Sequence, residues 1–141
     1  MLVLQNNSFV RSDNVYTAQK QNYVINFWPE KAFYIGAVSG AGSFVEGTYY
    51  YFTGNYYAGE YKNNLRSGKG TAHFTNGDVY VGQWKDDAMD GDGTYYYGGT
   101  KSGEYYKGKM SNNKMNGKGT YYLNGKKITG KWSNNQHVSW K

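Results

Sequence analysis

The feature that most limits how this chain can fold is a motif that recurs about every 23 residues. Tyr34, Tyr57 and Tyr80 are spaced by 23, and the same frame opens again at Tyr106 and Ile128. Each copy starts as Y-x-G-x-W or a close variant and continues to a G-x-G-T and a run of aromatic residues. The clearest copies are YAGEY (57–61), YVGQW (80–84), YKGKM (106–110) and ITGKW (128–132). A period of this length predicts small supersecondary units that stack on one another along the chain.

Each copy is predicted to form two antiparallel strands that a short turn joins. Side chains alternate along a strand, so Gly82 and Trp84 share one face. Residues 75–77, Thr-Asn-Gly, suit a three-residue hairpin loop with glycine in the left-handed conformation. This loop sets Gly70 opposite Gly82 and Gly68 opposite Trp84. We therefore expect the Trp84 ring to cover the bare backbone of Gly68.

The last hairpin gives an independent check on this register. It is one residue shorter between Gly119 and its turn glycine, Gly125, and a two-residue Asn124-Gly125 turn restores the pairing. The extra residues of the copy at 80–105 fall in GGTKSG (98–103), also at a turn, where length variation is tolerated. The predicted partners in the last hairpin are Gly119 with Gly130, Gly117 with Trp132, and Tyr121 with Ile128.

The composition fits a thin β-structure rather than a thick core. The 141 residues suffice for one domain and include 20 Gly and 17 Tyr but 1 Pro. Hydrophobic residues make up 38%, too few for a large core, whereas disordered chains are poor in aromatic residues. The sequence has no Cys, which excludes disulfides and thiolate metal sites. No apolar run is long enough for a membrane-spanning helix, and residues 1–10 lack the pattern of a signal peptide.

A Y-x-G-x-W followed by G-x-G-T, repeated at this period, resembles the MORN repeat. The resemblance covers residues 34–141, roughly four and a half copies, and departs from the motif at Met110 and Ile128. It implies an all-β protein: an elongated, twisted, single-layer antiparallel sheet of successive β-hairpins, with a groove lined by aromatic residues. The copies are expected at 34–56, 57–79, 80–105, 106–127 and, in part, 128–141.

Residues 1–33 match no repeat, and we expect them to cap the N-terminal end of the sheet. The end of an open sheet otherwise exposes unpaired backbone groups. Three segments in this region have the composition of edge strands: SFV (8–10), NVYTAQ (14–19) and NYVINFW (22–28).

No arrangement of residues in the sequence points to catalysis or to a metal. His73 stands where other copies have Tyr, and His137 lies in a polar stretch. Neither a nucleophile motif nor a phosphate-binding glycine loop is present. The acidic run at 86–92 fails the calcium-loop pattern at Ala88 and Tyr97, and it reads as a solvated loop between strands. We therefore expect a protein that is not an enzyme, with no catalytic residue, no metal and no cofactor.

The aromatic residues of the repeat allow two interpretations. Packed over the glycines, they form the thin core of the sheet, where each cross-strand aromatic pair contributes roughly 0.2–1 kcal/mol. A single layer cannot bury both of its faces alone, so some rings can instead line an open groove for a peptide, a helix or a glycan. The candidate binding residues of this aromatic groove are Tyr57, Tyr61, Tyr80, Trp84, Tyr106 and Trp132.

The excess positive charge is confined to the last quarter of the chain. The net charge is +6, and residues 106–141 hold 8 basic and no acidic residues. The predicted register sets Lys118 opposite Lys131, and like charges directly opposite are destabilising unless an anion lies near. The simpler interpretation is a solvated face; the alternative is an anionic lipid surface, where each Lys contributes roughly 1 kcal/mol. The candidate lipid-binding residues are Lys107, Lys109, Lys118, Lys126, Lys127 and Lys131.

Together these features predict a protein–protein interaction or scaffolding module, as the resemblance also implies. An open sheet end can pair with another strand, so a homodimer is one candidate assembly. Peripheral binding of acidic phospholipid is the alternative. A surface glycan or cell wall is a second one, because GTYYLNGKKITGKW (119–132) resembles glucan- and choline-binding repeats. Nucleic acid ranks behind these, since no RNA-binding signature is present. We expect a cytoplasmic location with peripheral membrane association, and a secreted or surface location stays open.

Overall fold

The protein folds as one antiparallel β-sheet. The computed structural model describes residues 2–5, 8–11 and 22–139. Within these ranges the sole helical element is a short 3-10 turn, η1 (Gly99–Lys101). The strands are β1 (Leu2–Gln5), β2 (Ser8–Arg11), β3 (Asn22–Trp28), β4 (Ala32–Val38), β5 (Phe44–Tyr51), β6 (Tyr56–Lys62), β7 (Leu65–His73), β8 (Val79–Lys85), β9 (Ala88–Tyr96), β10 (Tyr105–Ser111), β11 (Lys114–Leu123), β12 (Lys126–Ser133) and β13 (Gln136–Ser139).

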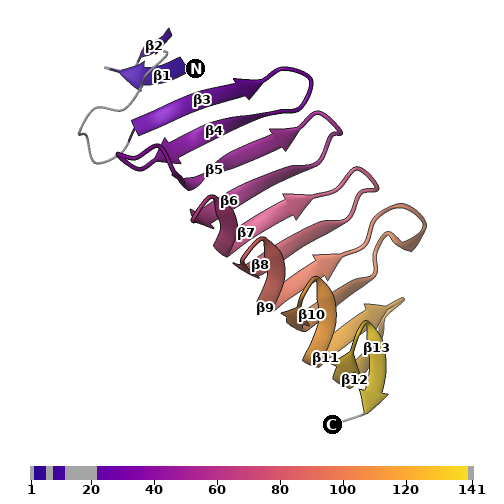
Figure 1. The fold of residues 1–141 in the computed structure, drawn as a ribbon. Helices are drawn as coiled ribbons and strands as arrows, with labels where there is room; N and C mark the ends of the chain where they lie inside the picture. Colours follow the sequence, from indigo (N-terminus) through magenta and orange to yellow (C-terminus); the bar gives the residue numbers. More distant parts are fainter. Residues whose placement is uncertain (1, 6–7, 12–21, 140–141) are drawn as a thin grey trace.

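The strands lie side by side in chain order from β3 to β13. At the other end β1 pairs with β3 and β2 forms the edge, which completes a 13-stranded sheet. Figure 1 shows a single layer that twists along its length, with no second layer against it among the described residues. Each hairpin therefore contacts the hairpins next to it in the sequence. This confirms the predicted all-β, elongated, single-layer fold.

A row of glycines crosses the middle of the sheet from β4 to β12, and each of these strands contributes one. Each glycine is paired with the glycine of the next strand, so the row is continuous. The predicted register of the hairpins is right, since the pairs Gly70–Gly82 and Gly119–Gly130 both belong to this row. The row consists of Gly36, Gly47, Gly59, Gly70, Gly82, Gly93, Gly108, Gly119 and Gly130.

A tyrosine ring lies over successive pairs of these glycines on one face, here called the tyrosine face. The Tyr80 ring lies against Gly82 and Gly93, where a Cβ at Gly93 would overlap it. Its hydroxyl donates a hydrogen bond of 2.9 Å to the carbonyl of Gln83. Tyr34, Tyr57 and Tyr106 make the same bond to the carbonyl three residues on, and all four tyrosines are fully buried. Glycine is required in this row because a side chain would occupy the space of the ring.

The tyrosine covers the glycines, whereas we expected the tryptophan to do so. Gly68 is paired with Trp84 as predicted, but a Cβ at Gly68 would meet the Glu60 side chain. Gly68 has a φ of 80° and lies where the register between β6 and β7 shifts. Trp84 packs edge-on against Tyr80 at 5.4 Å, and its Nε1 donates to the carbonyl of Gly70 at 3.1 Å. The conformation of a β-bulge, rather than an overlying ring, requires this glycine.

The hairpin ends beyond the glycine row curl to one side, as the β6–β7, β8–β9 and β10–β11 ends in Figure 1 show. Gly68, Gly91 and Gly117 have positive φ and lie next to register shifts, so these β-bulges bend the strands. The curled ends carry large side chains into the same buried cluster as the tyrosines. This is how a single layer buries one of its faces. The side chains added in this way are Trp84, Met89, Met110, Met115 and Trp132.

The acidic run that we predicted as a solvated loop is mostly strand, so that prediction is wrong in its extent. Asp86 and Asp87 form a two-residue turn with φ values of 47° and 73°, and β9 begins at the next residue, Ala88. The same positive-φ pairs recur at Asn63-Asn64, Asn112-Asn113 and Asn134-Asn135. Asn and Asp tolerate the left-handed conformation better than other side chains do.

The second residue of each of these turns bonds to the preceding hairpin. Asn113 Oδ1 accepts the N–H of Met89 at 2.8 Å, and the Asn113 N–H donates to the Met89 carbonyl at 3.1 Å. The same two bonds join Asn135 to Met115 and Asp87 to Arg66. These three turns are thus each fixed to the preceding hairpin by a pair of hydrogen bonds outside the strand ladder, and Asn64 Oδ1 accepts the N–H of Phe44 at 2.9 Å.

Replacing Asn113 with Gly is expected to lower the free energy of unfolding by about 1–2 kcal/mol. The Met89 N–H loses its acceptor, whereas the positive φ stays allowed. Asn113→Asp keeps an acceptor oxygen and is expected to cost less. Urea denaturation followed by tryptophan fluorescence measures both variants. An equal loss for Gly and Asp would contradict a role for the side-chain oxygen.

Two of the three N-terminal segments predicted as strands are strands. SFV (8–10) lies within β2, and NYVINFW (22–28) is β3, which pairs with β4 along its length. NVYTAQ (14–19) lies outside the described residues. Val24 of β3 is buried in a cluster with residues of β4, so β3 extends the tyrosine-face packing beyond the first repeat. The division into a cap at 1–33 and repeats from 34 onward stays a prediction.

Candidate functional site

Five of the six residues predicted to line an aromatic groove are buried in the tyrosine face. Tyr57, Tyr80 and Tyr106 are 1%, 0% and 0% exposed, and Trp84 and Trp132 are 4% and 7% exposed. All five belong to one buried cluster. Their rings pack on one another and on the glycine backbone, so a partner could reach them only if this packing opened.

Tyr61, the sixth predicted residue, joins the two parts of this core. Its ring contacts those of Tyr57 and Tyr34 edge-on, at centroid distances of 5.2 Å and 5.8 Å. Burial raises the pKa of Tyr61 well above its ordinary value. Burial also raises the pKa values of Tyr80 and Tyr106 to about 12. The six predicted residues therefore fill the tyrosine face themselves.

The opposite face, here called the open face, carries aromatic side chains of its own in a row across the strands. Tyr56 stacks on His73, and Tyr105 stacks on Tyr122, each with ring centroids 4.2 Å apart. Lys127 Nζ lies 5.6 Å from the centroid of the Tyr122 ring. This first row consists of Phe33, Tyr50, Tyr56, His73, Val79, Tyr96, Tyr105, Tyr122 and Lys127.

Two further rows of the open face run on either side of the glycines. The second row is small and mostly uncharged: Ile35, Thr48, Ala58, Thr71, Val81, Thr94, Lys107, Thr120 and Thr129. The third row is charged or polar: Glu46, Glu60, Lys69, Gln83, Asp92, Lys109, Lys118 and Lys131. A Cβ on any glycine of the row would point to the tyrosine face, so on the open face the strip between the second and third rows consists of backbone flanked by two rows of side chains.

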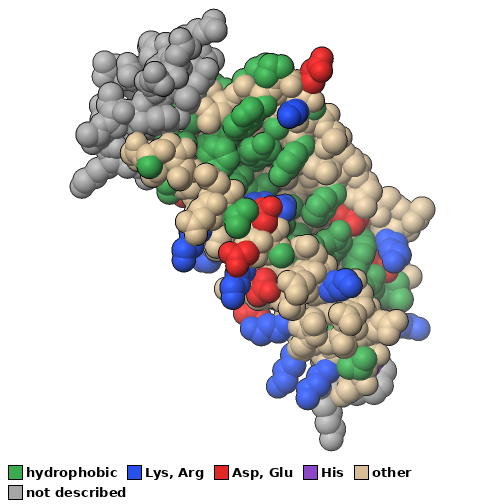
Figure 2. Space-filling model, in the orientation of Figure 1, with side chains coloured by type: hydrophobic (Ala, Val, Ile, Leu, Met, Phe, Trp, Pro, Cys, Tyr) green, Lys and Arg blue, Asp and Glu red, His purple; other side chains and the backbone are tan. Residues whose placement is uncertain are grey.

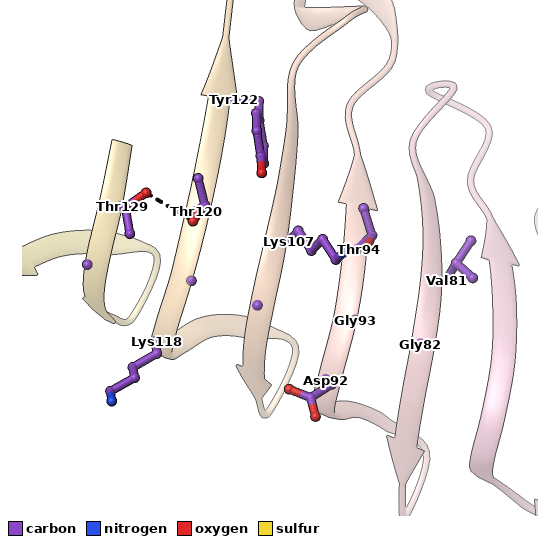
Figure 3. Close-up of a pocket in the computed structure, with 13 residues that line it drawn as sticks. Val81, Gly82, Asp92, Gly93, Thr94, Lys107, Lys118, Thr120, Tyr122 and Thr129 are labelled. Carbon is purple, nitrogen blue, oxygen red and sulfur yellow. Dashed lines mark hydrogen bonds between the residues drawn. The ribbon is translucent and has the colours of Figure 1, made fainter. Parts of the chain in front are cut away.

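This bare strip forms a trough of about 860 Å³ across β8 to β12. Figure 3 shows Val81, Thr94 and Thr120 along one side, with Asp92 and Lys118 at the other. The hydroxyls of Thr120 and Thr129 lie 3.1 Å apart and share a hydrogen bond. A second hollow of about 410 Å³ shares Val81 and Asp92 with the first and continues to β6. The glycines that form the floor of the larger trough are Gly82, Gly93, Gly108, Gly119 and Gly130.

Five of the six predicted lipid-binding lysines lie on the open face. Lys109 Nζ forms an ion pair of 2.9 Å with Asp92. Lys107, Lys118 and Lys131 have no carboxylate partner within 22–139. Lys126 alternates with Lys127 along β12, so it lies on the other face. Figure 2 shows Lys and Arg side chains gathered toward the C-terminal half of the sheet and hydrophobic side chains toward the N-terminal half.

The described residues do not gather into a metal or catalytic site. In the part of the chain that the structure describes, no group of three His, Cys, Asp or Glu is placed to hold a metal ion. His73 stacks in the aromatic row, and His137 Nε2 lies 3.1 Å from the carbonyl of Thr129. No described helix is long and apolar enough to cross a membrane.

Sequence reasoning sought an exposed aromatic surface on the face where the structure buries those rings. It followed the Tyr and Trp of Y-x-G-x-W, which share a face with glycine and are drawn into the core. The alternation of Tyr95 and Tyr96 carried the missing signal, because it sends one ring of each aromatic run to the core and the other to the open face. The trough itself depends on the alignment of two side-chain rows over many strands, which becomes visible once all the hairpins are placed in register.

The family comparison agrees with the repeating frame. A model of the MORN repeat matches residues 57–79, 80–100 and 106–126. Each match begins at a tyrosine that covers two glycines, namely Tyr57, Tyr80 or Tyr106. A search of curated proteins finds no significant match. With three consecutive matches in a sheet built from the same repeated register, this chain contains MORN repeats across residues 57–126.

Proposed function

We propose that this protein is a non-catalytic interaction module that holds an extended segment of another protein in the trough of its open face. The observation that carries the proposal is the bare glycine floor, bounded by side chains on both sides and left uncovered by the described residues. The tyrosine face gives this surface a rigid support, because its rings are packed and hydrogen-bonded to their own strands.

Exposed apolar side chains along the same face support this proposal. Ile35 and Val81, both in the second row, are 41% and 45% exposed. An apolar strip with a polar rim is typical of interaction sites on soluble proteins. The MORN-repeat match agrees, since this is generally a non-catalytic repeat module that often serves in binding.

Selection from a random library of 12-residue peptides tests the proposal. We expect selected peptides to lose at least tenfold in affinity against Thr94→Trp, because the indole would fill the trough between Val81 and Lys107. The matched control is Thr100→Trp, the same change at an exposed residue of η1 outside the trough, which should leave affinity within twofold. If no peptide is selected, or if every one binds both variants equally, the trough is not the binding surface.

Binding of acidic phospholipid is the second candidate function, and the open-face lysines favour it. A flat membrane meeting the open face would engage Lys107, Lys118 and Lys131 but not Lys126. Co-sedimentation with phosphatidylcholine vesicles, with and without phosphatidylserine, measures this binding across a salt series. If this candidate is right, the protein binds the anionic vesicles more strongly than the neutral ones. Lys118→Gln should reduce that binding, and Lys126→Gln should leave it unchanged.

A second copy of the chain is a further candidate partner. β13 is the last strand of the sheet among the described residues, and an end strand can pair with a strand of another chain. Light scattering of the purified protein at several concentrations tests this candidate, because a homodimer raises the measured mass to twice that of the 16.0 kDa chain.

A further inference from the structure

We infer that the segment bound in the trough is acidic where it crosses β10 to β12. This inference rests on the proposed function and adds the chemistry of the partner. It follows from the distribution of charge along the trough, which changes sign between the two ends of the sheet.

Positive charge at the C-terminal end of the trough lacks compensation. Lys118 and Lys131 are directly paired across β11 and β12. Both are exposed, and neither has a carboxylate partner within the described ranges. Lys107 lies in the second row, paired with Thr94 and Thr120, and in Figure 3 its side chain extends toward Thr94. Like charges directly opposite in a sheet repel, and carboxylates placed between these lysines would remove that repulsion.

The hydrogen-bonding groups around these lysines also suit carboxylates. Thr120 and Thr129 lie in the second row, across the floor of the trough from Lys118 and Lys131. Their hydroxyls can turn toward an acceptor. The one carboxylate on this part of the trough, Asp92, is already engaged by Lys109 at 2.9 Å. The end of the trough over β10 to β12 therefore presents donors with few acceptors.

The opposite end of the open face carries the reverse charge. Glu46 and Glu60 are directly paired across β5 and β6, and the next third-row residue, Lys69, donates its backbone N–H to Glu60 Oε1 at 2.7 Å. The second row beside them, Ala58, Thr71 and Val81, carries no charge. A uniformly acidic partner would meet repulsion at this end. The charge pattern thus restricts the acidic part of the segment to the C-terminal strands and leaves an apolar part over β6 to β8.

A concave strip favours a peptide over a membrane as the source of the anions. The floor lies below the side chains of the second and third rows, and a planar bilayer cannot follow it. An extended segment can lie on the floor and reach the lysines from it. We therefore assign the anionic groups to Asp and Glu side chains of a partner protein.

The peptides selected from the random library test this assignment through their composition and their dependence on lysine. We expect them to carry net negative charge and to lose at least tenfold in affinity when salt rises from about 50 to 500 mM. Lys118→Gln/Lys131→Gln should weaken them at least tenfold, and the charge reversal Lys107→Glu should do the same. Lys126→Gln, a neutralisation on the same strand but the other face, should leave affinity within twofold.

The outcomes separate this inference from the proposed function. Peptides that need an open trough but are neutral or basic would overturn the inference and leave the proposed function standing. Selection of no peptide would overturn both. A shift in light-scattering mass in Lys118→Gln/Lys131→Gln would also overturn the inference, because the carboxylates would then come from Glu46 and Glu60 of a second copy. If the protein binds anionic vesicles but not the acidic peptides, the lysines serve lipid binding and the inference is overturned.

Discussion

Gly93→Ala is expected to lower the free energy of unfolding by about 3 kcal/mol or more. The new Cβ would lie on the Tyr80 ring and hydroxyl. The packed core leaves no room for a small shift of the ring, so the ring can avoid the new methyl group only by leaving its rotamer and its hydrogen bond to Gln83. Adding bulk to a packed core costs typically 1–3 kcal/mol, and the lost bond adds about 1 kcal/mol.

Gly40→Ala is the matched control, because a Cβ there meets nothing within 4 Å and its φ is not in the left-handed region. It should be close to neutral. Chemical denaturation of both variants measures the difference. The double variant Gly93→Ala/Tyr80→Ala should be less destabilised than the sum of its two single changes, since the clash disappears with the ring. Additive losses would show that the ring and the glycine do not share this space.

A steep loss of stability above pH 10 is the second large effect. An exposed tyrosine has a pKa of about 10, whereas burial raises the pKa values of Tyr80 and Tyr106 to about 12. Burial also raises the pKa of Tyr95, and its hydrogen bond to the Asp78 carboxylate raises it further. The folded state therefore keeps these hydroxyls neutral where the unfolded state ionises them. Stability is complete below pH 10 and falls as pH rises toward the folded-state values.

Each buried hydroxyl contributes a loss of about 1.4 kcal/mol per pH unit in this range, and several act together. Urea denaturation between pH 8 and 11.5 measures the slope, and absorbance at 295 nm follows the ionisation. Tyr80→Phe/Tyr106→Phe should be less stable than the native chain at pH 8 but should lose less on going to pH 11. A slope unchanged by this double variant would mean that these two hydroxyls are not protected by the fold.

Much of the fold follows from the sequence because local rules and the repeat agree. The 75–77 loop and the Asn124-Gly125 turn are short enough to fix which residues face each other. Alternation then assigns every side chain to a face, and the repeat extends the result along the chain. The predicted pairs Gly68–Trp84 and Gly117–Trp132 are correct for this reason.

The parts that the sequence did not reveal depend on bends and on contacts between repeats. Gly68 was interpreted as a glycine within a strand and Gly91 as part of a solvated loop, yet their positive φ marks bulges that curl the hairpin ends. That curl buries Trp84 and Met89 and turns the expected aromatic groove into core. The bond from Asn113 to Met89 spans neighbouring repeats, so no single-repeat pattern predicts it.

The central claim is that the tyrosine face holds the sheet together and that the open face binds. Methyl NMR separates the two faces, because Thr94, Thr120 and Thr129 line the trough, whereas Met89, Met110 and Met115 are buried on the tyrosine face. Titration with a selected peptide is predicted to shift the signals of these threonine methyls and leave the three methionine methyls in place. Shifts of the methionine methyls with unchanged threonine methyls would contradict the account.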